Sequence, residues 1–291
     1  MDFYLTALLQ GLCLSSMALG IYLSMTIFKI PDISTDGTYT LGGAVSGLLL
    51  SLQWSAPLLF PLVFLAGALA GACTGLIHTR LKINALLSGI LVMTGLYSIN
   101  LTVMGRSNIP LLQVQTLFDR FRLVDHPQLN SLIVLLLFTL LVLLAIGFLL
   151  KSDYGLAMRA TGSSENMVRA LGVNTDRVKV LGLASANALT ASSGYLITQF
   201  QGFADINMGI GIVIVGLGSV IIAETFIQWL KIRSIWVILT LVCLGAIVFQ
   251  LVLAFTLSLG IDPSLLKLTT ACFVLLVVSL PRFNFFKKAY D

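Results

Sequence analysis

The sequence predicts an all-α membrane protein with about nine transmembrane segments, arranged as an inverted-repeat bundle that contains broken helices. Its 291 residues are 58% hydrophobic and only 10% charged, whereas a soluble domain carries about 25% charged residues. Apolar runs of about 18 residues or more recur along the chain, and each is long enough to cross about 30 Å of hydrocarbon as a helix. Residues 133–150 do not alternate between apolar and polar, which excludes a membrane β-barrel.

Eight apolar segments are long enough to be spans, and a ninth is shorter. The eight are residues 4–28, 57–77, 84–104, 131–150, 178–199, 208–230, 234–256 and 264–281. The shorter stretch, 39–52, has 14 residues, too few for a straight crossing, and we expect non-helical backbone at 31–38 to join it in a broken helix. The sequence leaves open whether 39–52 crosses the membrane or re-enters it.

The basic residues set the orientation of these spans. Cytoplasmic connections carry an excess of lysine and arginine, and nine crossings with an external N-terminus place 13 of the 17 basic residues inside. The exceptions are Arg106, Arg120, Arg122 and Lys267. The positive charge therefore indicates a membrane topology rather than nucleic-acid binding, and we expect the C-terminal tail to be cytoplasmic.

A weak internal repeat supports the nine-crossing topology. A pattern that begins at Gly67-Ala68 recurs 178 residues later at Gly245-Ala246. On this topology the loop 78–83 is cytoplasmic and its counterpart 257–263 is external, so the two copies have opposite orientations. Inverted repeats of this kind are a recurring architecture of transporters.

Glu224 is the one plausible acid inside a span. It lies within two turns of Lys231, and we expect it to be a structural brace near the inner gate with a polar partner, because an unpaired buried carboxylate is costly. Carriers driven by protons or sodium usually need several such groups. The chain also lacks a GxxxxGK[ST] phosphate loop, a Cys/His cluster and a nucleophile–base pair. The sequence therefore predicts no catalytic residue, no metal site and no cofactor in this chain.

Acidic and glycine-rich segments mark the two candidate broken helices. Asp32, Asp36 and Asp205 precede short helical starts, whose free N–H groups favour negative charge. We predict that these half-helix starts border a solute pathway; simple helix capping is the alternative. The residues concerned are Asp32, Thr35, Asp36, Gly37, Asp205, Asn207 and Gly209.

The longest cytoplasmic connection, 151–177, contains a short amphipathic helix at 163–172. Ser163 is a suitable N-cap, Gly172 is a natural stop, and Met167, Val168 and Leu171 form one apolar stripe. Such a helix would dock on a partner or on the membrane surface; a plain linker helix is the alternative. The candidate coupling residues are Ser163, Ser164, Glu165, Asn166, Met167, Val168, Arg169, Leu171 and Gly172. Glu165 and Arg169 would pair at i, i+4 and orient the contact through charged groups on the partner.

Several of these segments resemble those of bacterial ABC-importer permeases, the family of branched-chain amino acid and simple-sugar permeases. Gly155–Asn174 resembles the cytoplasmic loop of that family, Pro31–Gly37 its early glycine-rich element, and Gly202–Glu224 its later one. His78–Ile90 and Met104–Pro110 resemble a subgroup associated with aromatic amino acids.

The resemblance implies that residues 1–291 are one transmembrane permease domain, the membrane-spanning subunit of an importer in the bacterial inner membrane. The expected partners are a second permease copy, two cytoplasmic ATPase subunits that bind ATP and Mg, the lipid bilayer and an external solute-binding protein that delivers a small solute. The chain itself would be a transport subunit and not an enzyme. A stand-alone secondary carrier is the alternative function, and the sequence does not give the substrate.

The external loop 105–130 is a candidate docking surface for the binding protein, with an ordinary interfacial loop as the alternative. Its apolar residues alternate with charged ones. The apolar set is Leu111, Leu112, Leu117, Phe118 and Phe121, and the charged set is Arg106, Asp119, Arg120 and Arg122.

Overall fold

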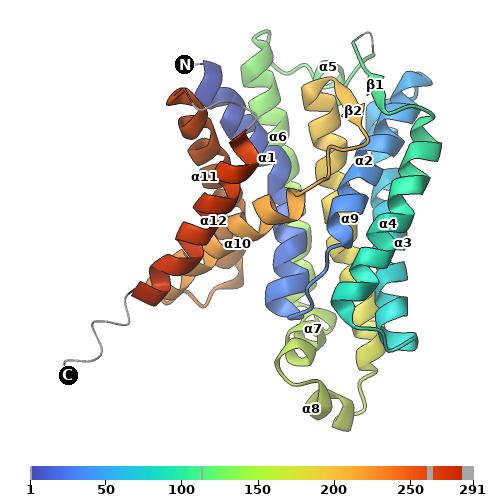
Figure 1. Cartoon of the computed structure of the whole chain (residues 1–291), viewed down its shortest axis with the longest axis vertical. Helices are drawn as coiled ribbons and strands as arrows, with labels where there is room; N and C mark the ends of the chain where they lie inside the picture. Colours follow the sequence, from blue (N-terminus) through green and yellow to red (C-terminus); the bar gives the residue numbers. More distant parts are fainter. Residues whose placement is uncertain (1, 113, 261–264, 284–291) are drawn as a thin grey trace.

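The computed structural model describes residues 2–112, 114–260 and 265–283, and Figure 1 shows them as a bundle of long helices. The predicted cytoplasmic tail beyond residue 283 lies outside this part of the chain. The helices are α1 (Asp2–Ile21), α2 (Ser34–Ser51), α3 (Ala56–Arg80), α4 (Ala85–Met104), α5 (Leu117–Arg120), α6 (Pro127–Lys151), α7 (Asp153–Ser163), α8 (Glu165–Ala170), α9 (Thr175–Gln201), α10 (Ile212–Trp229), α11 (Ile235–Ser258) and α12 (Leu266–Phe283). A π-helical segment, η1 (Tyr22–Ile27), extends α1, and the strands β1 (Asn108–Pro110) and β2 (Phe203–Asp205) pair antiparallel.

Within the described ranges, seven helices are long and apolar enough to cross a membrane. They are α1 with η1, α3, α4, α6, α9, α10 and α11. This result confirms the predicted all-α membrane fold. Helices α2 and α12 have 18 residues each but are not among the seven, so the number of nine crossings stays a prediction.

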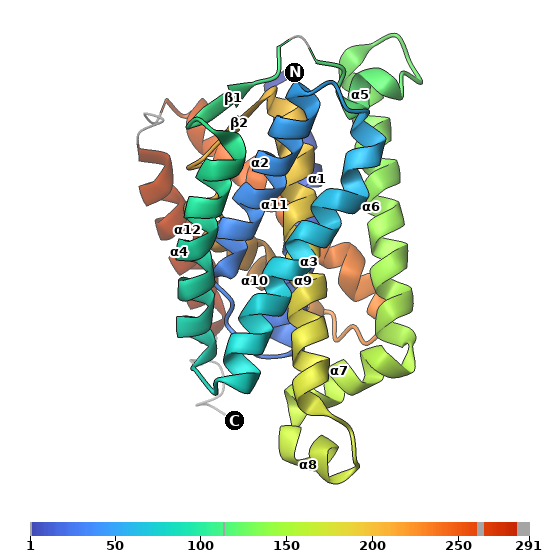
Figure 2. The same ribbon diagram turned by 90° about the vertical axis from the view of Figure 1, so that its right-hand side faces the viewer.

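Helix α9 lies at the centre of the bundle because its small side chains allow its neighbours to approach closely. Every residue from 186 to 199 is buried, and α1, α2 and α3 pack around the helix (Figure 2). A Cβ added at Gly42 of α2 or at Gly194 of α9 would overlap a backbone carbonyl of the opposite helix. The backbones of α2 and α9 are therefore in direct contact.

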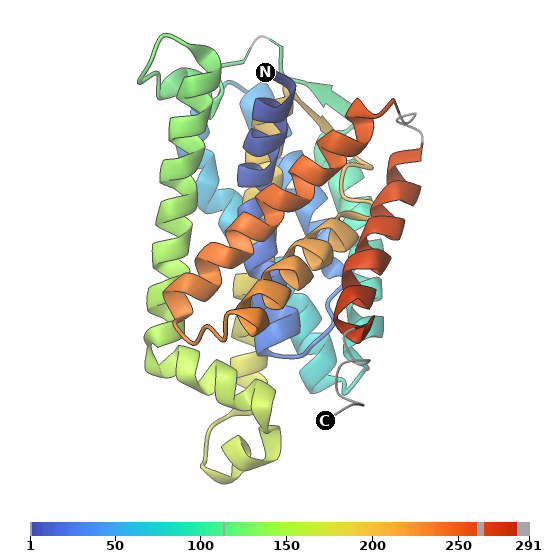
Figure 3. The same cartoon turned by 90° about the vertical axis from the view of Figure 1, so that its left-hand side faces the viewer.

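The helix bounds recur with the same 178-residue offset as the sequence pattern. Adding 178 to the bounds of α2 gives those of α10, and the bounds of α3 likewise give those of α11 within one residue. The packing also recurs, because α3 packs on α9 as α11 packs on α1, and α2 contacts α4 as α10 contacts α12. Corresponding helices run in opposite directions (Figures 1 and 3), as expected for an inverted repeat.

The connections expected in the cytoplasm lie together at one end of the bundle. This end, at the bottom of Figure 1, carries the α3–α4 connection, α7, α8 and the described end of α12, while the N-terminus, the β1–β2 sheet and α5 lie at the opposite end. We call the two ends the α8 end and the sheet end. The predicted orientation assigns the α8 end to the cytoplasm, and this assignment stays a prediction.

The predicted non-helical backbone at 31–38 is wrong for residues 34–38, because α2 begins at Ser34. Asp32 Oδ1 accepts a hydrogen bond at 2.8 Å from the backbone N–H of Ser34, the first residue of the helix. Polar residues in the first turns hid this start from a hydropathy-based reading. They are satisfied inside the helix, as where the Thr38 hydroxyl donates to the Ser34 carbonyl at 3.0 Å.

Candidate functional site

The N-terminus of α10 is capped by a side chain from α2. Asp36 accepts hydrogen bonds from the backbone N–H groups of Gly211 and Val213, both at 2.9 Å. The first N–H groups of a helix have no partner within the helix and carry partial positive charge. The carboxylate therefore joins the starts of α2 and α10, the two helices that correspond in the repeat. We call this contact the half-helix junction.

Asp32 ties the start of α2 to the central helix α9. Its carboxylate is fully buried and accepts hydrogen bonds from the Ser34 hydroxyl at 2.6 Å and from Asn187 Nδ2 of α9 at 2.7 Å. Thr35, which is also buried, donates its hydroxyl to the Asp32 carbonyl at 3.3 Å. Each oxygen of the buried carboxylate thus has a partner, and the start of α2 is tied to the central helix.

The second set of predicted pathway residues precedes α10, as expected from the sequence. Asp205 lies in β2, and its carboxylate accepts from Asn108 Nδ2 (3.2 Å) and Asn207 N (2.8 Å). Helix α10 begins only at Ile212. The turn before it brings Gly209 so close to α2 that an added Cβ would overlap the Asp36 carbonyl. The structure therefore brings Gly209 to the junction and leaves Asp205 and Asn207 outside it.

A cavity of about 320 Å³ adjoins the half-helix junction. It is lined by the first turns of α2, including Asp36 and Gly37, by α4, and by the turn at 206–210. Asn100 of α4 donates from Nδ2 to the Gly37 carbonyl at 3.0 Å, while its buried Oδ1 has no partner among the described residues. Tyr97 adds a half-exposed aromatic ring. The cavity can therefore offer a solute an apolar wall with an aromatic ring.

The sequence reading missed the α4 side of this cavity. Thr94, Tyr97 and Asn100 lie in the middle of a predicted span, and polar side chains at that depth usually face protein or a water-filled space rather than lipid. That spacing of uncharged polar residues was the available signal.

Glu224 has the polar partner that the sequence predicts. The Thr26 hydroxyl donates to Glu224 Oε1 at 2.7 Å, and this bond joins η1 to α10. Its proposed role as a brace near a gate stays a prediction.

The cytoplasmic connection folds into two helices, α7 and α8, instead of the single helix predicted at 163–172. Ser163 ends α7 and is not an N-cap; Ser164 has that position before α8, without a side-chain cap. Gly172 does end the helix, with φ +84°, and the hydrogen bonds Gly172 N to Arg169 O and Val173 N to Val168 O form a Schellman motif. Helix α7 was missed although Ser152 caps it by accepting from Gly155 N.

The predicted apolar stripe of α8 is divided between two faces. Val168 is 4% exposed and packs against the protein, which contradicts its expected place on the docking face, whereas Met167 and Leu171 are 64% and 72% exposed. These two side chains are four residues apart and so share one face. Asn166 is also exposed on this helix.

A charged cluster holds α8 on the start of α9. Glu165 pairs with Arg169 at 3.0 Å, as predicted, and with Lys179 of α9 at 2.6 Å; Arg169 also pairs with Asp176 at 3.3 Å. The hydrogen bond from Lys179 lowers the pKa of Glu165, with smaller contributions from Thr175 and Arg169. These charges are thus engaged within the chain, and their expected contact with charged groups on a partner stays a prediction.

Helix α7 is attached to both α9 and η1. The Tyr154 hydroxyl donates to the Val178 carbonyl at 3.1 Å, and burial raises the pKa of Tyr154 to about 12, so this donor stays protonated at neutral pH. At Gly162 an added Cβ would overlap the Ile27 carbonyl of η1. The α7–α8 unit is therefore in direct contact with the membrane-spanning bundle.

The predicted docking surface at 105–130 is only partly exposed. Leu111, Leu117 and Phe118 are buried, which contradicts their expected role as docking residues, whereas Leu112 is 89% and Phe121 47% exposed. The burial has two causes that the sequence did not indicate. Strand β1 pairs with β2, and Leu117 N donates to Gln199 Oε1 of α9 at 2.7 Å.

Comparison of the sequence with known proteins identifies the family of this chain. Residues 3–280 match the family model described as branched-chain amino acid transport system / permease component. A tyrosine transport system permease protein of Clostridioides difficile is 36% identical over 281 residues, covering 96% of this chain and 92% of that protein. No solved structure matches the chain.

Two further relatives match this chain over different lengths. An uncharacterized protein of Rickettsia prowazekii is 35% identical over 269 residues, or 92% of this chain and 94% of that protein. The ribose import permease protein of Haemophilus influenzae is 24% identical over 199 residues, or 67% and 60% of the two chains.

Proposed function

We propose, from the premise that the chain belongs to the permease-component family of branched-chain amino acid transport systems, that it is the membrane-spanning subunit of an ATP-binding-cassette importer. Family membership makes it a multi-pass transport permease, which in bacteria lies in the inner membrane, and not an enzyme. In the proposed assembly, two ATPase subunits bind ATP and Mg at the α8 end. A second permease copy and an external binding protein complete the importer.

The observation that carries the proposal is the rigid presentation of α8. Met167 and Leu171 expose one apolar face, while the Glu165 cluster and the buried Val168 fix the helix to the bundle. An apolar helix face can fill a groove on a partner, and an anchored helix can transmit force. A linker helix would need neither the exposed face nor the anchoring.

A chain of contacts runs from α8 to the half-helix junction. Helix α8 packs on α7, and α7 contacts η1 at Gly162 and Ile27. The Thr26–Glu224 bond then links η1 to α10, whose start is capped by Asp36. Movement of α8 by a bound ATPase would therefore act on α10, whose capping residue Asp36 lines the 320 Å³ cavity.

We further propose that the solute is an aromatic amino acid or a compound of similar shape. The relative at 36% identity is named a tyrosine transport permease. In the cavity, Tyr97 offers a ring against which an aromatic side chain can stack.

Reconstitution into proteoliposomes tests the importer against the stand-alone carrier. With the ATPase, the binding protein and ATP·Mg present, we expect uptake of labelled tyrosine that stops when ATP is replaced by a non-hydrolysable analogue. Uptake by the permease alone under a proton or sodium gradient would establish the carrier and contradict the importer. Labelled leucine and ribose are compared with tyrosine to test the substrate proposal. Equal uptake of tyrosine, leucine and ribose would contradict it.

A further inference from the structure

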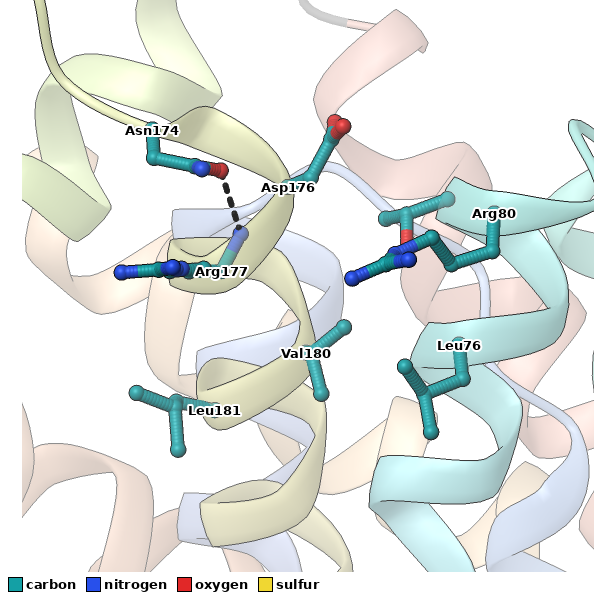
Figure 4. Close-up of a pocket in the computed structure, with 8 residues that line it drawn as sticks. Leu76, Arg80, Asn174, Asp176, Arg177, Val180 and Leu181 are labelled. Carbon is teal, nitrogen blue, oxygen red and sulfur yellow. Dashed lines mark hydrogen bonds between the residues drawn. The ribbon is translucent and has the colours of Figure 1, made fainter.

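A groove of about 500 Å³ lies between the end of α3 and the start of α9, at the α8 end of the bundle. Figure 4 shows Arg80 reaching from α3 toward α9, with Leu76 and Val180 between the two helices, while Arg177 and Leu181 extend from the other side of α9, away from α3. Each arginine lies closer to the end of its helix than the apolar residues do. The groove is therefore basic near the end of the bundle and apolar toward its middle.

The two arginines have no carboxylate partner within the described residues. Neither Arg80 nor Arg177 belongs to any of the ion pairs there. The acid that lines the groove, Asp176, is paired with Arg169 at 3.3 Å. The groove thus has two free positive charges and a carboxylate that is already neutralised.

The apolar part of the groove continues along α3. Exposed leucines follow one face of this helix at helical spacing: Leu58, Leu62, Leu65, Leu69 and Leu76. On α9, Leu181 is 56% exposed, although most of that helix is buried. A hydrocarbon chain lying on this face would have its polar end at the arginines.

We propose that this groove binds an anionic phospholipid, with the headgroup phosphate at Arg80 and Arg177 and the acyl chains along the leucines of α3 and α9. Basic pockets between transmembrane helices are suited to acidic lipid headgroups, and arginine can bind phosphate through two parallel hydrogen bonds. A second copy of this chain fits less well. The connections at 78–83, 151–179 and 231–233 carry nine basic and three acidic residues, so another copy would bring more positive charge.

Native mass spectrometry of the detergent-purified chain, titrated with phosphatidylglycerol or phosphatidylcholine, tests the site. We expect one phosphatidylglycerol to be retained more tightly than phosphatidylcholine. The double variant R80Q/R177Q should bind it about 30-fold more weakly, from about a fivefold factor for each arginine near a membrane surface. Arg233→Gln is the matched control, because this exposed arginine lies at the same end of the bundle but does not line the groove. This substitution should change the affinity less than twofold.

Two further measurements distinguish a specific lipid site from diffuse charge attraction and from a site for free phosphate compounds. Leu181→Asn keeps both arginines and should still weaken lipid retention, while soluble glycerol phosphate should not displace the lipid. Equal weakening by R80Q, R177Q and R233Q, each as a single variant, would reduce the effect to diffuse charge attraction and overturn the proposal. Displacement by glycerol phosphate, or loss of ATPase binding with unchanged lipid retention in R80Q/R177Q, would also overturn it.

Discussion

At the scale of single residues, Asp36 has the most demanding position, since its carboxylate serves the N-terminus of a helix to which it does not belong. It accepts from two backbone N–H groups of α10, and hydrogen bonds to a charged group contribute more than neutral ones. The sequence indicated Asp36 as a residue of a half-helix start. It could not identify the helix that Asp36 caps, because that contact joins residues about 175 positions apart.

Asp36→Asn should therefore destabilise the protein by about 1–2 kcal/mol, since the amide replaces one charged acceptor with a donor. We expect a lower thermal unfolding midpoint in detergent together with lower uptake in proteoliposomes. Asp205→Asn is the matched control, because this carboxylate contacts only the turn and the sheet at the surface. Equal midpoints for Asp36→Asn and the wild type would contradict the capping role.

Glu165 predicts a pH dependence at the α8 end. Its pKa in the folded protein lies below the ordinary value of 4.5, so its stabilising contribution is fully present above about pH 4.5 and is lost as the pH falls through the lower folded value. A spin label at Leu171→Cys, in a background without the native cysteines, should become more mobile in that acidic range. Glu165→Gln should be mobile at every pH; an unchanged, pH-independent wild-type signal would show that the cluster does not hold α8.

At the scale of elements, the long apolar helices were predictable from the sequence and the short polar elements were not. Residues 84–104 and 131–150 were identified within a few residues because hydropathy alone defines such spans. The start of α2 was missed because its serine and threonine residues make this segment look polar. Their hydroxyls are satisfied by the helix itself. Helix α7 and the β1–β2 sheet depend on tertiary contacts, such as Gly162 against Ile27, which no local pattern contains.

The link between η1 and α10 can be tested through Glu224. Glu224→Ala should lower the free energy of unfolding by about 1–2 kcal/mol, because the Thr26 hydroxyl loses its acceptor. Glu224→Gln keeps an acceptor oxygen and should recover most of the loss in a thermal unfolding measurement. A Glu224→Ala variant as stable and active as the wild type would exclude the brace.

At the scale of the whole molecule, the positive-inside rule and the inverted repeat predict the same arrangement of the helices in the membrane. The basic connections lie together at the α8 end (Figure 1), and the repeat inverts the direction of corresponding helices. Charge counting predicts an orientation from composition alone, and that orientation stays a prediction. Charge counting could not predict the cavity at the half-helix junction, which requires α2, α4 and the turn at 206–210 to meet in space.

Cysteine labelling tests the orientation with two exposed positions. Leu112→Cys, at the sheet end, should react in intact cells with a membrane-impermeant maleimide, because the predicted topology places it outside. Ser163→Cys, at the α8 end, should react only after the cells are opened. The native cysteines are replaced in both variants, and the reverse labelling pattern would invert the topology.

The central claim is that α8 transmits force from a separate ATPase to the membrane bundle, and co-purification of the ATPase with α8 variants tests it most directly. Met167→Asp and Leu171→Asp place a charge on the exposed apolar face, where burial against a partner would cost about 1–3 kcal/mol or more, while Asn166→Asp adds the same charge beside it. We expect the first two variants to remain folded, to lose the ATPase and to lose solute-stimulated ATP hydrolysis, and the Asn166→Asp control to keep all three properties. Wild-type ATPase binding and stimulation in Met167→Asp and Leu171→Asp would contradict the claim.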